Sequence, residues 1–280
     1  MAKLITFADG NFGIRSAAKR LVRQGSDSGY FSGGCETWDL SKLTSVDSGF
    51  RDKHLNFVRE NPKGLGLWLW QPAVLLNALA NASEGELIVF LDAGCQIVCN
   101  AEASKRFSDY LKMAEDSGFL FVQIKNGAFG IDDLGEKYWT KRSCLRFFNL
   151  SSELNNVPQI QSGLIFIANT PEGRQFVSQW YEICVANNYE LLRDATADEE
   201  QEHGFISHRY SQSILSLMVK QNSLQYLVDE TYWHPDWSLG LDYPIWTMRN
   251  RSGGDAFRRN GLDLLLIGFA KLERKIRSIL

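Results

Sequence analysis

Short apolar runs alternate along the chain with longer segments in which apolar residues recur at helical spacing. This alternation predicts strand–helix units and a largely parallel sheet. The run from Leu87 to Leu91 has no polar residue, which is typical of a central strand covered on both faces. The predicted strands are 4–8, 87–91, 119–124 and 163–168, and the predicted helices are 15–24, 72–82, one that begins after Thr170, and 210–221.

The end of the chain predicts a separate element. A glycine-containing stretch at 249–254 precedes a segment, 262–280, in which apolar residues face Lys and Arg at helical spacing. We therefore divide the chain into a domain at 1–250 and a basic amphipathic C-terminal helix at 251–280. Such a helix either packs on its own domain or lies on an anionic membrane surface, and the sequence leaves both alternatives open.

Composition narrows the class of protein. Apolar residues make up 44% of the 280 positions and charged residues 22%, an ordinary balance for a globular protein. The net charge is −3, and before the C-terminus no cluster of basic residues of the kind that binds nucleic acid is visible. The five cysteines form no CxxC pair, which predicts reduced thiols. The N-terminus lacks the pattern of a signal peptide, and no apolar stretch approaches the about 18–20 residues of a membrane span. These features predict a cytoplasmic protein, located at the inner membrane surface if the C-terminal helix binds there.

Asp92 is the most informative polar position, because it directly follows the predicted central strand. In open parallel sheets, ligands bind beyond the carboxyl ends of the strands. A carboxylate there suits a divalent cation, Mn²⁺ or Mg²⁺, that neutralises a diphosphate leaving group. The following Ala93 and Gly94 let the backbone approach a ligand closely. The alternative is that Asp92 simply caps a turn.

Four motifs in order resemble a set of bacterial and viral glycosyltransferases with a GT-A fold. Their patterns are GyGyWxWKP, a strand that ends in (Y/F)LDAGC, a (Q/E)xGxxxxxxT segment and an HRxDQSxxSLL helix start. This chain matches them with Gly64–Pro72, Phe90–Cys95, Gln161–Thr170 and His208–Leu217, and the resemblance covers most of residues 1–250.

The resemblance implies a GT-A-like α/β fold, a mixed and mostly parallel central sheet flanked by helices. It implies a nucleotide-sugar donor, usually UDP-linked, and transfer of a hexose to a hydroxyl of a glycan or lipid-linked glycan in polysaccharide biosynthesis. Asp92 would lie at the donor or metal site and Gln212 near the reacting face of the sugar, with retention of configuration favoured. Ala8, Asp9 and Gly10 would contact the base and ribose, or else form a plain strand-to-helix turn.

Further candidate residues come from later in the chain. Arg249 and Arg251 suit a diphosphate, because guanidinium groups pair with phosphate oxygens, and otherwise form the solvated end of a domain. By similarity to glycogenin-like enzymes, His234 would complete the metal site, against the alternative of a histidine packed in an aromatic loop. His208 begins a helix and would favour an anion, or is exposed. Two further residues are expected to bind substrate, Gln161 and Trp70.

The chain also departs from the family pattern at three positions. Gly94 replaces the second carboxylate of a DxD motif, Gln71 replaces the lysine of WKP, and Ser211 replaces the aspartate of the DQ pair. These changes motivate an alternative hypothesis, a non-catalytic nucleotide- or carbohydrate-binding protein. A nucleotidyltransferase is a third reading, although no glycine-rich phosphate loop is visible.

Overall fold

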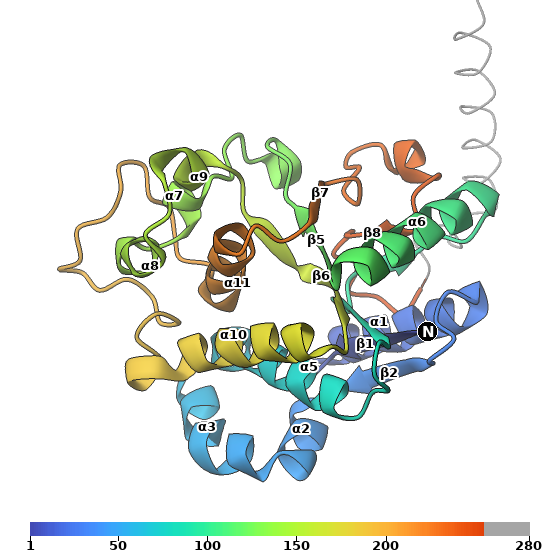
Figure 1. Cartoon of the computed structure of the whole chain (residues 1–280), viewed down its shortest axis with the longest axis horizontal. Coiled ribbons are helices and arrows are strands. Elements are labelled where there is room, and N and C mark those ends of the chain that lie inside the picture. Colours follow the sequence, from blue (N-terminus) through green and yellow to red (C-terminus); the bar gives the residue numbers. More distant parts are fainter. Residues whose placement is uncertain (255–280) are drawn as a thin grey trace, which may run out of the picture.

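The computed structural model describes residues 1–254 and is built around a six-stranded sheet in the order β2-β1-β3-β6-β5-β7 (Figure 1). All strands run in one direction except β6, which is antiparallel to both of its neighbours. The mixed, mostly parallel sheet flanked by helices in one domain is therefore confirmed. The strands of this sheet are β1 (Ala2–Phe7), β2 (Cys35–Trp38), β3 (Leu87–Leu91), β5 (Phe119–Gln123), β6 (Ile160–Ala168) and β7 (Tyr226–Val228).

Helices cover both faces of the sheet, and a small antiparallel pair, β4 (Gln96–Ile97) with β8 (Ile245–Trp246), lies beside it (Figure 1). No helix within residues 1–254 is long and apolar enough to cross a membrane. The helices are α1 (Phe12–Ser28), α2 (Leu40–Val46), α3 (Ser48–Glu60), α4 (Gly64–Leu67), α5 (Trp70–Ala80), α6 (Ala101–Ser117), α7 (Glu136–Trp139), α8 (Arg142–Phe148), α9 (Ser152–Asn156), α10 (Pro171–Tyr189) and α11 (Tyr210–Gln221), with 3₁₀ turns at Ala128–Gly130 and Trp237–Gly240.

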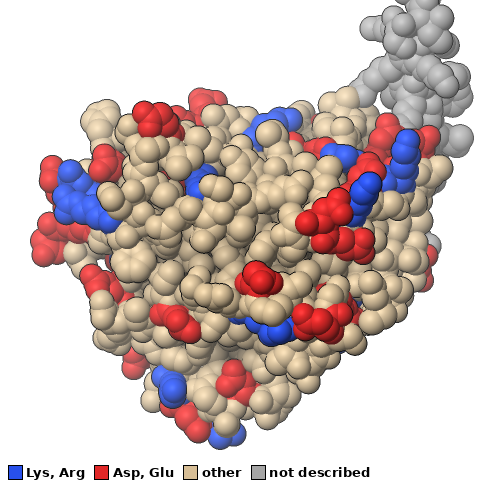
Figure 2. Space-filling model, in the orientation of Figure 1, with Lys and Arg blue, Asp and Glu red and all other residues tan. Residues whose placement is uncertain are grey.

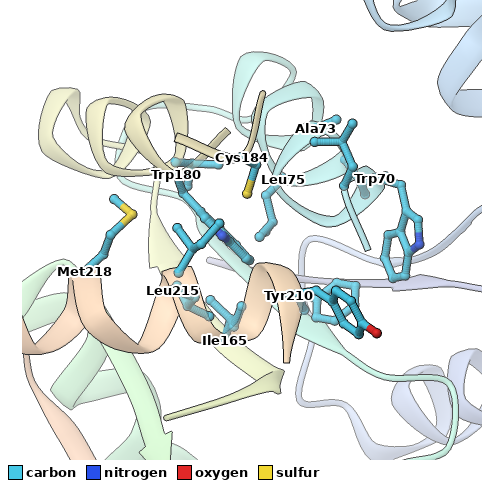
Figure 3. Close-up of a cluster of buried hydrophobic side chains, with 14 of the residues drawn as sticks. Trp70, Ala73, Leu75, Ile165, Trp180, Cys184, Tyr210, Leu215 and Met218 are labelled. Carbon is cyan, nitrogen blue, oxygen red and sulfur yellow. The ribbon is translucent and has the colours of Figure 1, made fainter. Parts of the chain in front are cut away.

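Strand β3 is the centre of the molecule, because its side chains enter two different cores. Ile88 and Phe90 point into the core formed with α5, α10 and α11, whereas Val89 and Leu91 join the core formed with α6. All five residues of β3 are fully buried. Figure 3 shows the first core, where Trp180 of α10 lies among side chains of α5, β6 and α11. A strand without polar alternation is therefore covered on both faces, as predicted.

Element boundaries agree best where the sequence carries a specific local signal. The predicted bounds of β3 and α11 are those of the structure, and the Thr170 hydroxyl caps α10 by accepting from Gly173 N (3.1 Å). Strand β6 begins three residues earlier than predicted, because Ser162 and Gly163 interrupt its apolar run. The predictions omitted the other elements, which include the sheet strands β2 and β7, the longer helices α3 and α6, and the short helices α7, α8 and α9.

The predicted helix at 262–280 lies outside the described residues. Of the unit predicted at 251–280, only residues 251–254 are described.

Replacing Trp180 tests the packing of the first core. The side chain is fully buried, and its indole nitrogen donates to Ser211 O (3.0 Å). We expect Trp180→Ala to lower the free energy of unfolding by about 3–5 kcal/mol in urea denaturation. Phe12→Ala, at a side chain that is 86% exposed, should change it by no more than about 0.5 kcal/mol. Equal losses in the two variants would contradict this packing.

Candidate functional site

A cleft of about 810 Å³ opens at the carboxyl edge of the sheet. The ends of β1 and β3 contribute to its wall, and so does the beginning of β6, because an antiparallel strand starts where its neighbours end. Most of the remaining wall comes from the first turns of α1, the start of α11, the turn at 62–68 and the chain at 247–251. Segments distant in the sequence therefore meet at the edge where α/β sheets bind ligands.

Asp92 lies on the floor of this cleft, one residue beyond β3. Its backbone N–H donates to Gly163 O (2.9 Å), and a Cβ atom at position 163 would lie 2.7 Å from the Asp92 Oδ2 atom. Gly163 is therefore what allows the carboxylate to rest against β6. The carboxylate is open to the cleft but surrounded by protein, and this loss of hydration raises its pKa to about 6, while Arg249 opposes the shift.

Cationic side chains dominate the cleft, although the whole chain carries a net charge of −3. Those in the wall are Lys63, Arg209, Arg249 and Arg251, against the carboxylates of Asp9 and Asp92. The Asp9 carboxylate is already engaged, since it accepts from Leu40 N (3.0 Å) and from Gly10 N (2.6 Å). On the face shown in Figure 2, acidic and basic side chains are intermingled. The cleft thus differs from that surface in favouring an anion.

Arg209 is held close to a second guanidinium. Burial, together with the nearby charge of Arg249, lowers its pKa to about 10, so the group is still cationic at neutral pH. Its guanidinium lies 3.9 Å from the centroid of the Trp139 ring. Two cations directed into one cleft repel each other, and an anionic ligand between them relieves that repulsion.

A buried polar network behind the cleft fixes Arg209 and Gln212. Both donate to the Gln159 side-chain oxygen, at 3.4 Å and 3.1 Å respectively. Gln159 is fully buried and donates in turn to the Glu136 carboxylate (3.1 Å). Glu136 forms a buried ion pair with Lys220 at 2.7 Å. A network with this many partners holds the two side chains of the wall in one orientation.

The turn at one end of the cleft has an unusual backbone. Residues 64–68 all have positive φ, between 53° and 83°, a region that costs an L-residue about 1–2 kcal/mol. The turn places Trp68 against Tyr210, with ring centroids 5.8 Å apart and planes at 22°. Trp68 is partly exposed in the cleft, whereas Trp70 is buried and stacks on Phe7 at 3.8 Å. Both tryptophans line the cleft, and Trp68 is the more exposed of the two.

The cleft brings together most of the predicted site residues. Those in its wall are Asp9, Gly10, Trp70, Asp92, Gly94, Gln161, His208, Gln212, Arg249 and Arg251. Ala8 lies behind the wall, buried in a small apolar cluster with Ala17, Ala18 and Ala93. It packs behind the wall and is not among the residues that line the cleft.

Two histidines were predicted to take part in the site, His208 with an anion and His234 with a metal. His208 is buried with its Nε2 atom 2.9 Å from Leu191 O, while Nδ1 accepts from Lys141 N (3.4 Å). Burial lowers its pKa to about 3, so the ring is neutral and both nitrogens are occupied. His234 is absent from the residues that line the cleft. It is exposed, and its ring centroid lies 6.2 Å from that of Tyr232.

The residues at the floor do not fit a divalent cation. Mg²⁺ and Mn²⁺ require several oxygen ligands, and Asp92 supplies the single carboxylate that is not already engaged. A Cβ atom at Gly94 would lie 3.0 Å from the Arg249 Cα atom, so backbone fills the space of a second carboxylate. Within residues 1–254, no group of three His, Cys, Asp or Glu side chains is placed to hold a metal.

The sequence left two alternatives for Arg209, together with His208: a helix start that favours an anion, or an exposed pair. The arginine-rich character of the cleft emerges only when α11 meets residues 249–251. Arg20 was not considered, because a single arginine inside a predicted amphipathic helix gives no sign that it will be buried.

Comparisons with known proteins give structural likeness only. No family model matches the chain, and no curated protein matches it. Mouse xyloside xylosyltransferase 1 in its apo form is similar, with 11% identity over 88% of this chain and 97% of that chain and a TM-score of 0.44. A glycosyltransferase involved in the glycosylation of the major capsid of PBCV-1 is also similar, with 11% identity over 90% and 94% and a TM-score of 0.43. Similarity at this level assigns no activity, so the account of the site rests on this chain's own residues.

The raised pKa of Asp92 predicts a pH-dependent cost to stability. Its folded pKa of about 6 exceeds the usual value of about 3.9, so folding favours the protonated carboxyl and the ionised form destabilises the fold. Asp92→Asn should therefore have a higher melting temperature than the wild type at pH 7.5. The difference should shrink as the pH falls from 6 to 4. A difference that is constant with pH would show that the carboxyl is not desolvated.

Proposed function

We propose that the chain is a glycosyltransferase that moves a hexose from a nucleotide-diphosphate sugar, UDP-linked by the resemblance, to a hydroxyl of a glycan or lipid-linked glycan. The observation that carries the proposal is the convergence of Asp92 with Arg209 and Arg249 in one cleft at the carboxyl edge of the sheet. The cleft volume of about 810 Å³ falls within the usual range for small-molecule sites. The four motifs quoted above contribute the substrate class.

The arginines suit the leaving group. When the bond between the anomeric carbon and the phosphate oxygen breaks, the nucleoside diphosphate takes the electron pair and gains negative charge. Arg209 and Arg249 would stabilise that charge through bidentate, charge-assisted hydrogen bonds. Arg209 is already oriented by Gln159, so little reorganisation is required during the reaction.

Asp92 and Gln212 would position the sugar. The Asp92 carboxylate accepts hydrogen bonds from sugar hydroxyls, and Gln212 lies on the same wall, where Ser162 Oγ donates to its side-chain oxygen (3.4 Å). The acceptor hydroxyl oxygen then bonds to the anomeric carbon. For transfer with retention, which the resemblance favours, the proton of that hydroxyl passes to the departing phosphate oxygen. The partly exposed face of Trp68 would stack against a sugar ring.

Loss of the Asp92 carboxylate should slow transfer strongly. Asp92→Asn should lower the rate of release of nucleoside diphosphate from the sugar nucleotide, in the presence of acceptor, by about 100-fold or more. The matched control is Asp27→Asn, at an exposed position of α1 outside the cleft, which should retain the wild-type rate.

The same assay tests the alternative of a non-catalytic binding protein. Transfer that is unchanged in Asp92→Asn would overturn the assignment of the site. Tight binding of a sugar nucleotide by the wild type, with no turnover for any hydroxyl acceptor, would replace the proposal with the binding protein. The blocked space at Gly94 is the observation that favours this second function.

A further inference from the structure

A buried arginine joins two walls of the cleft. The Arg20 side chain, on α1, is 2% exposed, and its guanidinium donates four hydrogen bonds to backbone carbonyls. Nη2 donates to Ala93 O (3.1 Å) and Cys95 O (2.7 Å), in the turn that follows Asp92. Nη1 donates to Asn250 O (3.1 Å) and Ser252 O (2.6 Å). One planar group therefore fixes the distance between the turn after β3 and the segment that carries Arg249 and Arg251.

The second of these walls, residues 249–252, is here called the arginine segment. It lies directly on the turn after β3, since Asn250 N donates to Gly94 O (2.9 Å) and the Arg249 Cα atom lies 3.0 Å from where a Cβ at Gly94 would be. On its other side it meets the first turn of α1, where a Cβ at Gly13 would lie 2.9 Å from Arg251 O. Glycine at both positions allows this close approach of backbone. The Arg249 and Arg251 side chains then line the cleft beside Asp92.

The geometry points to Arg20 as a positioning residue that holds the arginine segment in place. The guanidinium groups of this segment then supply the positive charge of the site, so that diphosphate binding needs no divalent metal. This inference rests on the proposed function and deepens it. The backbone of the arginine segment fills the space that a second metal-binding carboxylate would use, and the same segment brings the guanidinium of Arg249 close enough to Asp92 to oppose its pKa shift. Fixed guanidinium groups and a bound cation supply the same charge neutralisation to a diphosphate.

Lysine should not replace arginine at position 20. A planar guanidinium offers five N–H donors in a fixed fork, whereas an ammonium is a point charge with three donors. Only the fork reaches the carbonyls of both segments at once. Arg20→Lys should therefore keep the positive charge on α1 but release the arginine segment.

Calorimetric titration with UDP, GDP and CDP tests the inference on the full chain, each in excess EDTA and in Mn²⁺. We expect one nucleoside diphosphate to bind with a dissociation constant that agrees within about twofold in the two conditions. Arg249→Gln, at an exposed side chain whose loss should not unfold the chain, should weaken that binding about ten- to hundred-fold in EDTA. Binding that requires Mn²⁺ would overturn the inference while leaving the proposed function intact. No binding of any nucleoside diphosphate in either condition would overturn both.

The positioning role of Arg20 has its own readout. Arg20→Lys should weaken nucleoside diphosphate binding about tenfold or more in samples shown to be folded by circular dichroism, and Lys19→Met, at the exposed neighbour on α1, should not. In a double-mutant cycle, Arg20→Lys should add little further loss to Arg249→Gln, because Arg20 acts through the segment. Additive losses, or an unchanged dissociation constant with a lowered melting temperature, would assign Arg20 a purely structural role.

Discussion

The pairing of β3 with the antiparallel strand β6 is the constraint on which the rest of the site depends. It places Leu91 beside Leu164, so that the residue after β3 faces the beginning of β6. Asp92 then lies against Gly163, where any side chain would collide with its carboxylate. Reversal of one strand also brings Gln161 and Ser162 to the same edge as the ends of β1 and β3. A sheet with β6 parallel would have left that wall of the cleft at the opposite edge.

Charge is distributed around this floor in an unusual way. The Asp92 carboxylate shares the cleft with several guanidinium groups. The charge of Arg249 contributes to the lowered pKa of Arg209. Positioning like charges together requires support, and here it comes from neutral groups. The Gln159 side chain orients Arg209, and backbone carbonyls bound by Arg20 hold the segment of Arg249. The site is therefore preorganised for an anion before any ligand enters.

The sequence predicted the parts of the molecule whose signal is local. The apolar run of β3, the Thr170 cap and the position of Asp92 after the strand each follow from a few adjacent residues. What escaped prediction depends on contacts between distant segments. Arg20 lies 230 positions from Asn250, and nothing in the sequence of α1 reports that the two will meet. The lone Gly94 was understood as a missing carboxylate, whereas the structure shows a backbone that occupies that space.

The central claim is that a nucleoside diphosphate binds above Asp92 and is neutralised by arginine. The most direct measurement is a crystal structure of the chain with the nucleoside diphosphate that binds most tightly, grown in EDTA and compared with one grown in Mn²⁺. The account predicts the same pose in both, with diphosphate oxygens within hydrogen-bonding distance of the Arg249 guanidinium and no cation between them and Asp92. A diphosphate bound elsewhere, or a Mn²⁺ ion that links it to Asp92, would contradict the account.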